Sequence, residues 1–183
     1  MLISASDAVS SEIETERTKM RPHHLTDFEN CARMWANMAV TKHITGRPST
    51  KAESWARHLR HIGHWKALGF GYWVVLDKES NAFLGEVGFG LFHRDMEPAL
   101  GEYPEIGWVL SPTAHGRGLA SETARAATLW GDTYFTVPKT VCIVAPEHTP
   151  SIRVAEKQGY KTVGTSVYMG GPTLILERDI ARS

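Results

Sequence analysis

A glycine-rich turn between a short apolar strand and an alanine-rich helix constrains this chain more than any other feature. The segment runs from Glu105 to Ala126 and contains the apolar run EIGWVL, the break Ser111-Pro112 and the turn HGRGLA. Glycines allow consecutive backbone N–H groups to point outward, and the positive end of the helix dipole reinforces them. A phosphate or pyrophosphate binds to such an arrangement. The segment therefore predicts a site for a phosphate-bearing ligand.

The composition is that of one globular domain. The chain has 183 residues, and its 20 basic residues balance its 20 acidic residues. We therefore expect neither a nucleic-acid nor a membrane partner, but a small molecule or a peptide. Cys31 and Cys142 show no pairing pattern, which indicates reduced, buried thiols in a cytoplasmic protein. Residues 1–12 are expected to form a flexible tail before a single domain over residues 13–183.

The hydrophobic pattern predicts hairpins mixed with strand–helix–strand units. A weakly patterned stretch, Thr15–Arg21, precedes two amphipathic helices, and a hairpin over residues 72–92 follows them. The strand Glu105–Leu110 and a helix over about Leu119–Tyr134 come next. The remaining elements are a strand at Thr140–Val144, a helix, and two last strands at Lys161–Tyr168 and Pro172–Arg178. This order predicts an α/β fold of the α+β kind, with one mixed sheet flanked by helices.

Local signals predict where the helices begin and which faces they bury. One helix opens at Thr50 with Glu53 three residues later, a capping box, and should continue to Gly69. A later helix should have Thr149 as its N-cap and Pro150 in its first turn. The apolar face of the helix after Thr50 is expected to consist of Ala52, Trp55, Leu59 and Ile62. The helix before it should place Phe28, Cys31, Trp35 and Met38 on one face.

Two common phosphate-binding motifs do not fit the glycine turn. A P-loop requires Gly-Lys followed by Ser or Thr, and the chain contains no such tripeptide. The dinucleotide fingerprint GxGxxG should lie near the start of a βαβ unit. Here Gly116 and Gly118 are followed by Ser121, and the turn lies after four strands and two helices. A P-loop nucleoside triphosphatase is excluded, and a dinucleotide site is disfavoured.

The turn and a second segment together resemble a known family. HGRGLASETARA after EIGWVLSP, with PEHTPSIRVAEKQGYKTVG further on, resembles the GNAT superfamily of acetyl-CoA-dependent N-acetyltransferases. The branch most similar to this chain acetylates the N-terminal amine of ribosomal proteins. The resemblance spans Thr15 to Arg178, from TERTKMRP to the YMGGPTLILERD hairpin. It implies a single GNAT-like domain whose mixed, mostly antiparallel twisted sheet has about seven strands flanked by about four helices.

The resemblance also implies how acetyl-CoA binds. The family's pyrophosphate turn reads Gln/Arg-x-x-Gly-x-Gly/Ala, so Gly118 and Ala120 match it and His115 departs from it. The pantetheine arm would lie between two strands that diverge, paired with the strand before the turn, and one amide of that strand would polarise the thioester carbonyl. The implied cofactor-binding residues are Trp108, Val109, Leu110, His115, Gly116, Arg117, Gly118, Leu119, Ala120, Ser121, His148 and Ser151.

Two catalytic roles, an acid and a base, have candidate residues. The branch's second motif, Asn-x-x-Ser, here begins with His148 and ends with Ser151. In other branches a tyrosine four residues beyond the serine protonates the leaving thiolate, and this chain has Ala155 at that position. Ser151 is therefore the expected acid for the departing thiolate, with support of the helix N-terminus as the alternative. Glu105 is the expected base, acting through water, with a hydrogen-bonded structural carboxylate as the alternative. Glu86 is a second candidate for the base.

The acceptor amine stays open at this stage. Direct attack on the thioester requires a neutral amine, and at pH 7 about one-seventh of an α-amino group is neutral, against about one part in 2,500 of a lysine side chain. A peptide N-terminus, a polyamine, an aminoglycoside and an amino acid analogue all suit the same scaffold. A non-catalytic acyl-CoA-binding module is the alternative function. We expect a monomer or a homodimer.

A histidine-rich helix raises the question of a metal. His58, His61 and His64 recur at every third position, without the i, i+4 pairing of helical zinc ligands and without a nearby cysteine. We therefore expect no metal and a polar helix face. Six large aromatic residues are expected mostly in the core, with a minority near the acceptor groove. They are Trp35, Trp55, Phe89, Phe92, Trp108 and Tyr168.

Overall fold

A computed structural model describes residue 2 and residues 11–181 of the chain. Its first elements are β1 (Ile13–Glu14), β2 (Thr18–Pro22), α1 (Phe28–Trp35), α2 (Met38–Thr41), α3 (Lys51–Leu68), β3 (Tyr72–Asp77) and β4 (Phe83–Gly90). They are followed by β5 (Glu105–Leu110), α4 (Leu119–Tyr134), β6 (Lys139–Val144), α5 (Thr149–Lys157), β7 (Lys161–Tyr168) and β8 (Gly171–Asp179). Short 3-10 helices lie at Leu25–Asp27 and Pro112–Ala114.

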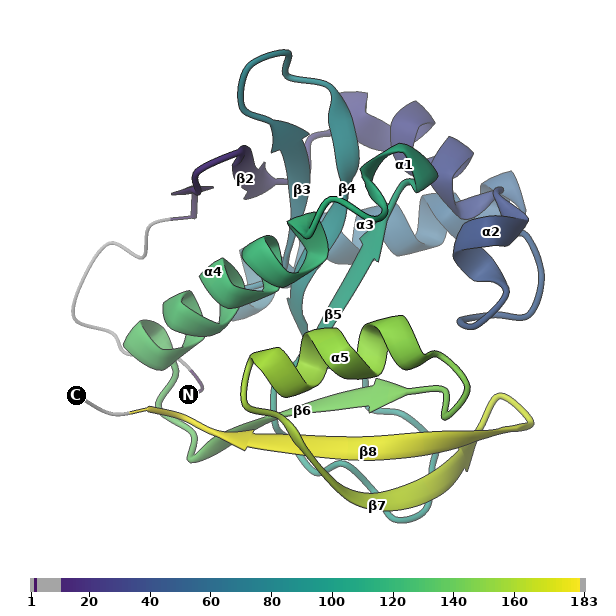
Figure 1. Cartoon of the computed structure of the whole chain (residues 1–183), viewed down its shortest axis with the longest axis vertical. Coiled ribbons are helices and arrows are strands. Elements are labelled where there is room, and N and C mark those ends of the chain that lie inside the picture. Colours follow the sequence, from purple (N-terminus) through teal and green to yellow (C-terminus); the bar gives the residue numbers. More distant parts are fainter. Residues whose placement is uncertain (1, 3–10, 182–183) are drawn as a thin grey trace.

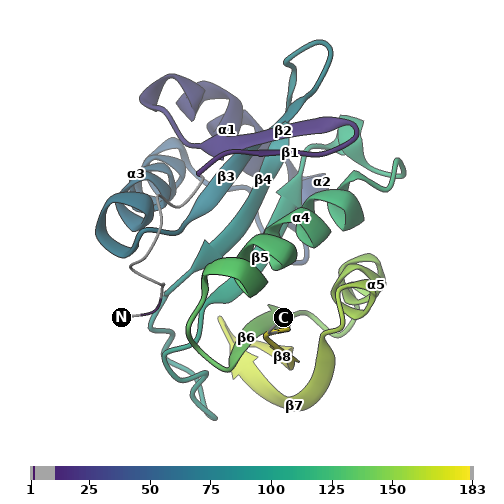
Figure 2. The same ribbon diagram turned by 90° about the vertical axis from the view of Figure 1, so that its left-hand side faces the viewer.

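The strands form one mixed sheet in the order β1-β2-β3-β4-β5-β6-β8-β7. Every neighbouring pair is antiparallel except β5 and β6, which are parallel. Helices α1 to α3 cover one face of the sheet, and α4 and α5 cover the other (Figures 1 and 2). The fold class expected from the sequence is therefore confirmed. The described residues contain eight strands and five α-helices, slightly more than expected, and one of the strands, β1, has only two residues.

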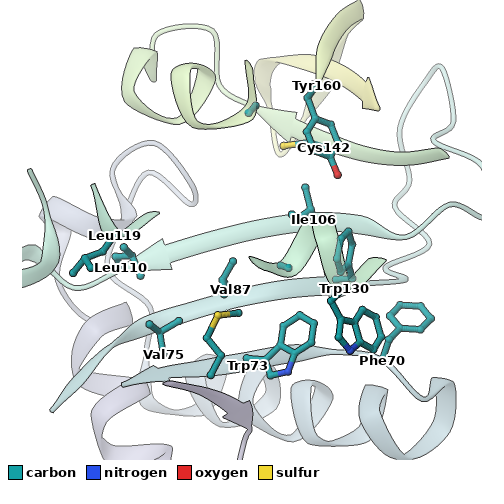
Figure 3. Close-up of a cluster of buried hydrophobic side chains, with 14 of the residues drawn as sticks. Phe70, Trp73, Val75, Val87, Ile106, Leu110, Leu119, Trp130, Cys142 and Tyr160 are labelled. Atoms are coloured by element: carbon teal, nitrogen blue, oxygen red, sulfur yellow. The ribbon is translucent and has the colours of Figure 1, made fainter. Parts of the chain in front are cut away.

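The main core fills the space between the sheet and α4 (Figure 3). The Trp73 and Trp130 rings meet edge to face with centroids 5.2 Å apart, and Phe89 meets Phe135 in the same way at 4.9 Å. Such aromatic pairs stabilise a core beyond the area that they bury. Trp35 and Phe89 are buried as expected, and so are both free cysteines. No helix in the described part of the chain is long and apolar enough to cross a bilayer.

Local signals predicted most element boundaries well. The strands Glu105–Leu110 and Lys161–Tyr168 and the helix Leu119–Tyr134 have the expected bounds. The Thr50 capping box is present, and Gly69 ends α3 in the left-handed conformation. The N-cap of α5, however, is His148 and not Thr149. The tail expected at residues 1–12 falls mostly outside the described residues.

The prediction for the first helix was only partly correct. Helix α1 ends at Trp35. Asn37 is the N-cap of a separate helix, α2, because its side chain accepts a hydrogen bond from the Ala39 amide at 2.9 Å. Met38 therefore leaves the predicted apolar face and is 49% exposed. The cause is a local side-chain cap that competes with continuation of the helix.

The predicted buried face of α3 was wrong. Trp55 and Leu59 are 41% and 44% exposed, whereas His58 and His61 are 1% and 3% exposed. The expected polar face of histidines thus points into the protein at these two positions. The reason is a buried carboxylate on β4, Glu86, because a charge in the interior requires polar partners.

Gly88 on β4 provides a test of close packing in the fold. A Cβ atom at this position would overlap the Gly71 carbonyl and the Tyr72 Cα. We expect Gly88→Ala to lower the free energy of unfolding by about 1–3 kcal/mol, because backbone atoms must move to admit the methyl group. The matched control is Gly63→Ala on the exposed side of α3, where nothing lies within 4 Å. This change should instead add about 0.5–1 kcal/mol through helix propensity. Urea unfolding measures the free energy of unfolding of both variants. Equal effects would contradict the close packing of Gly88 against the backbone of Gly71 and Tyr72.

Candidate functional site

The parallel strands β5 and β6 separate almost as soon as they meet. Their register contains a single pair, Glu105 with Val141, and the Val141 amide donates to the Pro104 carbonyl at 3.0 Å. On their other sides β5 pairs with β4 and β6 pairs with β8 over six residue pairs each. Figure 1 shows the strands β6 to β8 fanning away from β3 to β5. The inner edge of β5 beyond Glu105 is therefore open to an extended ligand.

The glycine turn lies at the wide end of this opening. Gly116 and Gly118 have φ values of 72° and 76°, a left-handed backbone that glycine adopts without strain, and Gly118 is the N-cap of α4. The first-turn amides of Leu119, Ala120 and Ser121 have no intrahelical acceptor. Residues 115–118 are exposed to solvent. The turn thus presents a row of N–H groups where an anion can reach them.

The turn is braced from both sides by side chains. The His115 Nε2 atom lies 2.9 Å from the Leu110 carbonyl oxygen, and because a carbonyl only accepts, Nε2–H is the donor. On the outer side, Arg17 donates to the Arg117 carbonyl at 2.9 Å and forms an ion pair with Glu122. The histidine that departs from the family pattern therefore closes the turn onto β5.

A surface groove of about 450 Å³ begins beside the turn, between α4 and the end of α5. Its walls contain two cationic side chains, Arg125 and Lys157, and one carboxylate, Glu122, which is paired with Arg17; the groove meets the turn at Ser121. Sequence reasoning missed both cations because they belong to helix surfaces far apart in the chain. Because of these two cations, the groove suits an anionic part of a ligand whose phosphate binds at the turn.

Several predicted cofactor residues meet across the opening. The Trp108 indole N–H donates to the Ser151 hydroxyl at 3.3 Å, so the side chains of β5 and α5 bridge the gap. The His148 ring stacks on His43, which follows α2, with ring centroids 4.6 Å apart. Burial, reinforced by His43, lowers the pKa of His148. Residues from β5, α5 and the α2 loop thus converge at one place.

Glu105 lies at the closed end of the opening in an ion pair. Both of its oxygens accept from Arg94, at 2.6 and 2.7 Å, and Arg94 also donates to the Tyr168 hydroxyl at 2.5 Å. Burial opposes the charge of Arg94, but the Glu105 carboxylate outweighs it and raises the pKa of the guanidinium. Arg94 was missed from the sequence because no motif or spacing marks it. Its contact with Tyr168 spans 74 positions.

The second candidate carboxylate, Glu86, is 1% exposed beneath α1 and α3. Its Oε2 atom accepts from the Trp35 indole at 2.8 Å, while His23 Nε2 and His61 Nδ1 each lie 3.7 Å from Oε1. Burial alone would raise the pKa of Glu86, but the neighbouring histidines and Trp35 outweigh it and lower that pKa. No wall of either described cavity includes Glu86.

Tyr72 on β3 is a further residue that sequence reasoning missed. Its hydroxyl lies directly against Gly107, where any side chain would overlap it. Its ring stacks on His61 at a centroid distance of 4.5 Å and an interplanar angle of 7°. Burial raises the pKa of this hydroxyl. Tyr72 therefore connects the buried histidines to the strand that borders the opening.

A mixed sheet opened between two parallel strands, with a glycine turn at the N-terminus of the following helix, defines the class of acyl-CoA N-acyltransferases. The chain belongs to the acetyltransferase (GNAT) family, because the model of that domain matches residues 17–161. The uncharacterized N-acetyltransferase p20 of Bacillus licheniformis is 26% identical over 151 residues, 82% of each chain.

Solved structures agree with this membership. A protein from Bordetella pertussis, provisionally described as a GnaT-family acetyltransferase, has a TM-score of 0.81 and 28% identity, over 91% of this chain and 98% of its own. The spermidine N-acetyltransferase of Vibrio cholerae, solved in complex with CoA and spermine, has a TM-score of 0.71 over 91% of this chain and 97% of its own. Its identity is 15%, so it supports the fold alone.

The Arg94–Glu105 pair allows a direct test of what holds the closed end. We expect Arg94→Met to lower the free energy of unfolding by about 3–5 kcal/mol, because Glu105 would stay buried without a counter-charge. The matched control is Arg47→Met, which removes a bidentate partner of Glu53 at the surface, where the effect should be much smaller. Denaturant unfolding measures both variants. Similar losses in the two would contradict a special role for the Arg94 pair.

Proposed function

We propose that this protein transfers an acetyl group from acetyl-CoA to a primary amine by direct attack in a ternary complex. The observation that supports this most is the opening of β5 from β6 in front of the glycine turn. An extended thioester arm would fit this edge, with its reacting end near Glu105 and its phosphates at α4. Holding amine and thioester together provides most of the rate enhancement, through effective molarity.

The cofactor would bind mainly to backbone groups. The amides from Gly116 to Ser121 would hold the pyrophosphate, with the guanidinium of Arg117, which lies 3.9 Å from Asp77, as a cation beside them. The inner edge of β5 from Trp108 to Leu110 would pair with the pantetheine amides. The groove with Arg125 and Lys157 would take the nucleotide end. In this arrangement His115 acts within the turn and His148 beside the arm, which accounts for two departures from the family pattern.

Ser151 is the proposed proton donor to the leaving thiolate. Its hydroxyl oxygen accepts the indole N–H of Trp108, so its own proton is free to point into the opening. A thiolate with a pKa near 8.5 leaves without strong acid assistance, so a weak donor is enough. We therefore expect Ser151 to make a modest contribution to the rate.

The two carboxylates support an acceptor that arrives as the neutral amine. Both oxygens of Glu105 already accept hydrogen bonds from Arg94, and Glu86 is closed off under α1 and α3. Without a free strong base, an α-amine is favoured over a lysine side chain, since far more of it is neutral at pH 7. We therefore propose an α-amine acceptor, such as a peptide N-terminus. The resemblance to the ribosomal-protein branch agrees with this proposal.

Release of CoA in the presence of a panel of amines tests the function. We expect a peptide with a free α-amine to produce CoA faster than a polyamine or an Nα-blocked lysine. Gly118→Val should weaken CoA binding at least about tenfold, because a β-branched residue disfavours the left-handed backbone that aims the amides. Thiol detection measures turnover, and calorimetry measures binding.

The matched control is Gly170→Val in the β7–β8 turn, which has a φ of 80° and open space around it. It introduces comparable backbone strain away from the cofactor turn, so CoA binding should be unchanged. Tight CoA binding with no thiol release for any amine would reject the enzyme in favour of a binding module. Equal CoA affinity of the two glycine variants would reject the proposed pyrophosphate site.

The role of Glu105 can be tested through pH dependence. We expect Glu105→Gln to lower kcat/KM for an α-amine acceptor without shifting the profile, whose apparent pKa should follow the acceptor amine. The control is Glu102→Gln, an exposed acid in the loop before β5. Loss of the acidic limb of the profile, or a shift of its midpoint, in the Glu105 variant alone would instead identify Glu105 as the base.

A further inference from the structure

Five side chains with metal-binding atoms meet behind β4, although they come from four separate parts of the chain. They are His23 after β2, Cys31 on α1, His58 and His61 on α3, and Glu86 on β4, and each is at most 4% exposed. The ligand atoms of His23, His61 and Glu86 all lie within 4.8 Å of one another. Such burial of polar groups is costly unless something satisfies them.

The histidines of this cluster are not satisfied by the protein. Among the described residues, no hydrogen-bond partner exists for His23 Nε2, His58 Nδ1 or His61 Nδ1. His23 Nε2 and His61 Nδ1 both approach the same oxygen, Glu86 Oε1, at 3.7 Å. This distance is too long for a hydrogen bond. It is close to the separation of about 3.3 Å between two ligands of a tetrahedral ion with bonds of about 2.0–2.1 Å.

Surrounding groups hold the cluster in the orientation that a metal requires. The Trp35 indole donates to Glu86 Oε2, which leaves Oε1 turned toward the two histidines. His61 is fixed by its stack on Tyr72. Next to it, His58 Nε2 donates to the His24 carbonyl at 3.0 Å, which leaves a lone pair on Nδ1. Partners of this kind orient ligands around metal ions in proteins.

We propose that His23 Nε2, His61 Nδ1 and Glu86 Oε1 bind a divalent first-row transition-metal ion, with Zn²⁺ as the ion to test. Two imidazoles and one carboxylate are a ligand set that such ions accept, with a further position for water or His58. The ion would join the β2–α1 connection and α3 to β4, and would neutralise the buried carboxylate. Its role is structural, since the cluster lies under α1 and α3 and outside the walls of both described cavities.

Cys31 belongs to a second group, with His23 and His58, and faces the other nitrogen of the His23 ring, so we leave it outside the proposed ligand set. Its sulfur lies 3.9 Å from His23 Nδ1, whereas Glu86 and His61 gather at Nε2. The expectation of no metal rested on spacing within α3, and that rule does not apply here because α3 supplies only one of the three ligands. The others come from β4 and from the segment after β2.

Metal content of the full-length protein tests the proposal. The protein is first stripped of metal with a chelator and dialysed. When Zn²⁺ is then added, we expect wild type to bind about one equivalent by elemental analysis and to melt at a higher temperature than without Zn²⁺. His61→Gln and His23→Gln should abolish both effects. His64→Gln, one turn further along α3 and outside the cluster, should retain them.

Two further measurements identify the ligands. With Co²⁺ in place of Zn²⁺ we expect visible d–d absorption without a thiolate charge-transfer band, unchanged in Cys31→Ser. Trp35→Phe should keep one equivalent of metal but lower its affinity about 10- to 100-fold. The proposal is overturned if wild type is folded, as checked by circular dichroism, but takes up no added Zn²⁺ and shows no thermal shift. A thiolate band lost in Cys31→Ser would overturn the ligand set.

Discussion

A carboxylate buried at the centre of the sheet determines how the first helices pack. Removing an ionised Glu86 from water costs several kcal/mol unless other groups compensate. The Trp35 indole on α1 donates a hydrogen bond to Glu86, and the His61 ring on α3 approaches the same carboxylate at 3.7 Å, so both helices turn polar groups toward β4. The apolar residues Trp55 and Leu59 then face solvent. One interior charge thus reverses the amphipathic pattern of an 18-residue helix.

The opening in the sheet depends on a second charge pair. Glu105 forms the only β5–β6 pair and also binds Arg94, which in turn contacts Tyr168 on β7. The ion pair therefore connects the loop before β5 to a strand of the other half of the sheet. Among the described residues, β5 and β6 share no further pair beyond this point, and side chains such as Trp108 and Ser151 bridge them. A rigid closed end and an open far end are what an extended ligand between two strands requires.

Features encoded by neighbouring residues could be predicted from the sequence, and features that depend on distant contacts could not. The Thr50 capping box and the turn at Gly116 and Gly118 involve residues a few positions apart, so their signals are local. The Arg94–Tyr168 contact and the approach of His23 to Glu86 arise only when the sheet forms. The prediction of the buried face of α3 was wrong for the same reason, because hydrophobic periodicity does not reveal a carboxylate on a distant strand.

The two histidines that depart from the family pattern, His115 and His148, both contact other groups of the protein. His115 directs a ring nitrogen to a carbonyl of its own turn, and His148 stacks on another ring. Both therefore satisfy protein groups rather than requiring a ligand. The features that a pyrophosphate needs, left-handed glycines and a free helix N-terminus, belong to the backbone. A pyrophosphate site made of amides, as proposed for this turn, would persist as long as the fold sets their direction, even where side chains nearby differ.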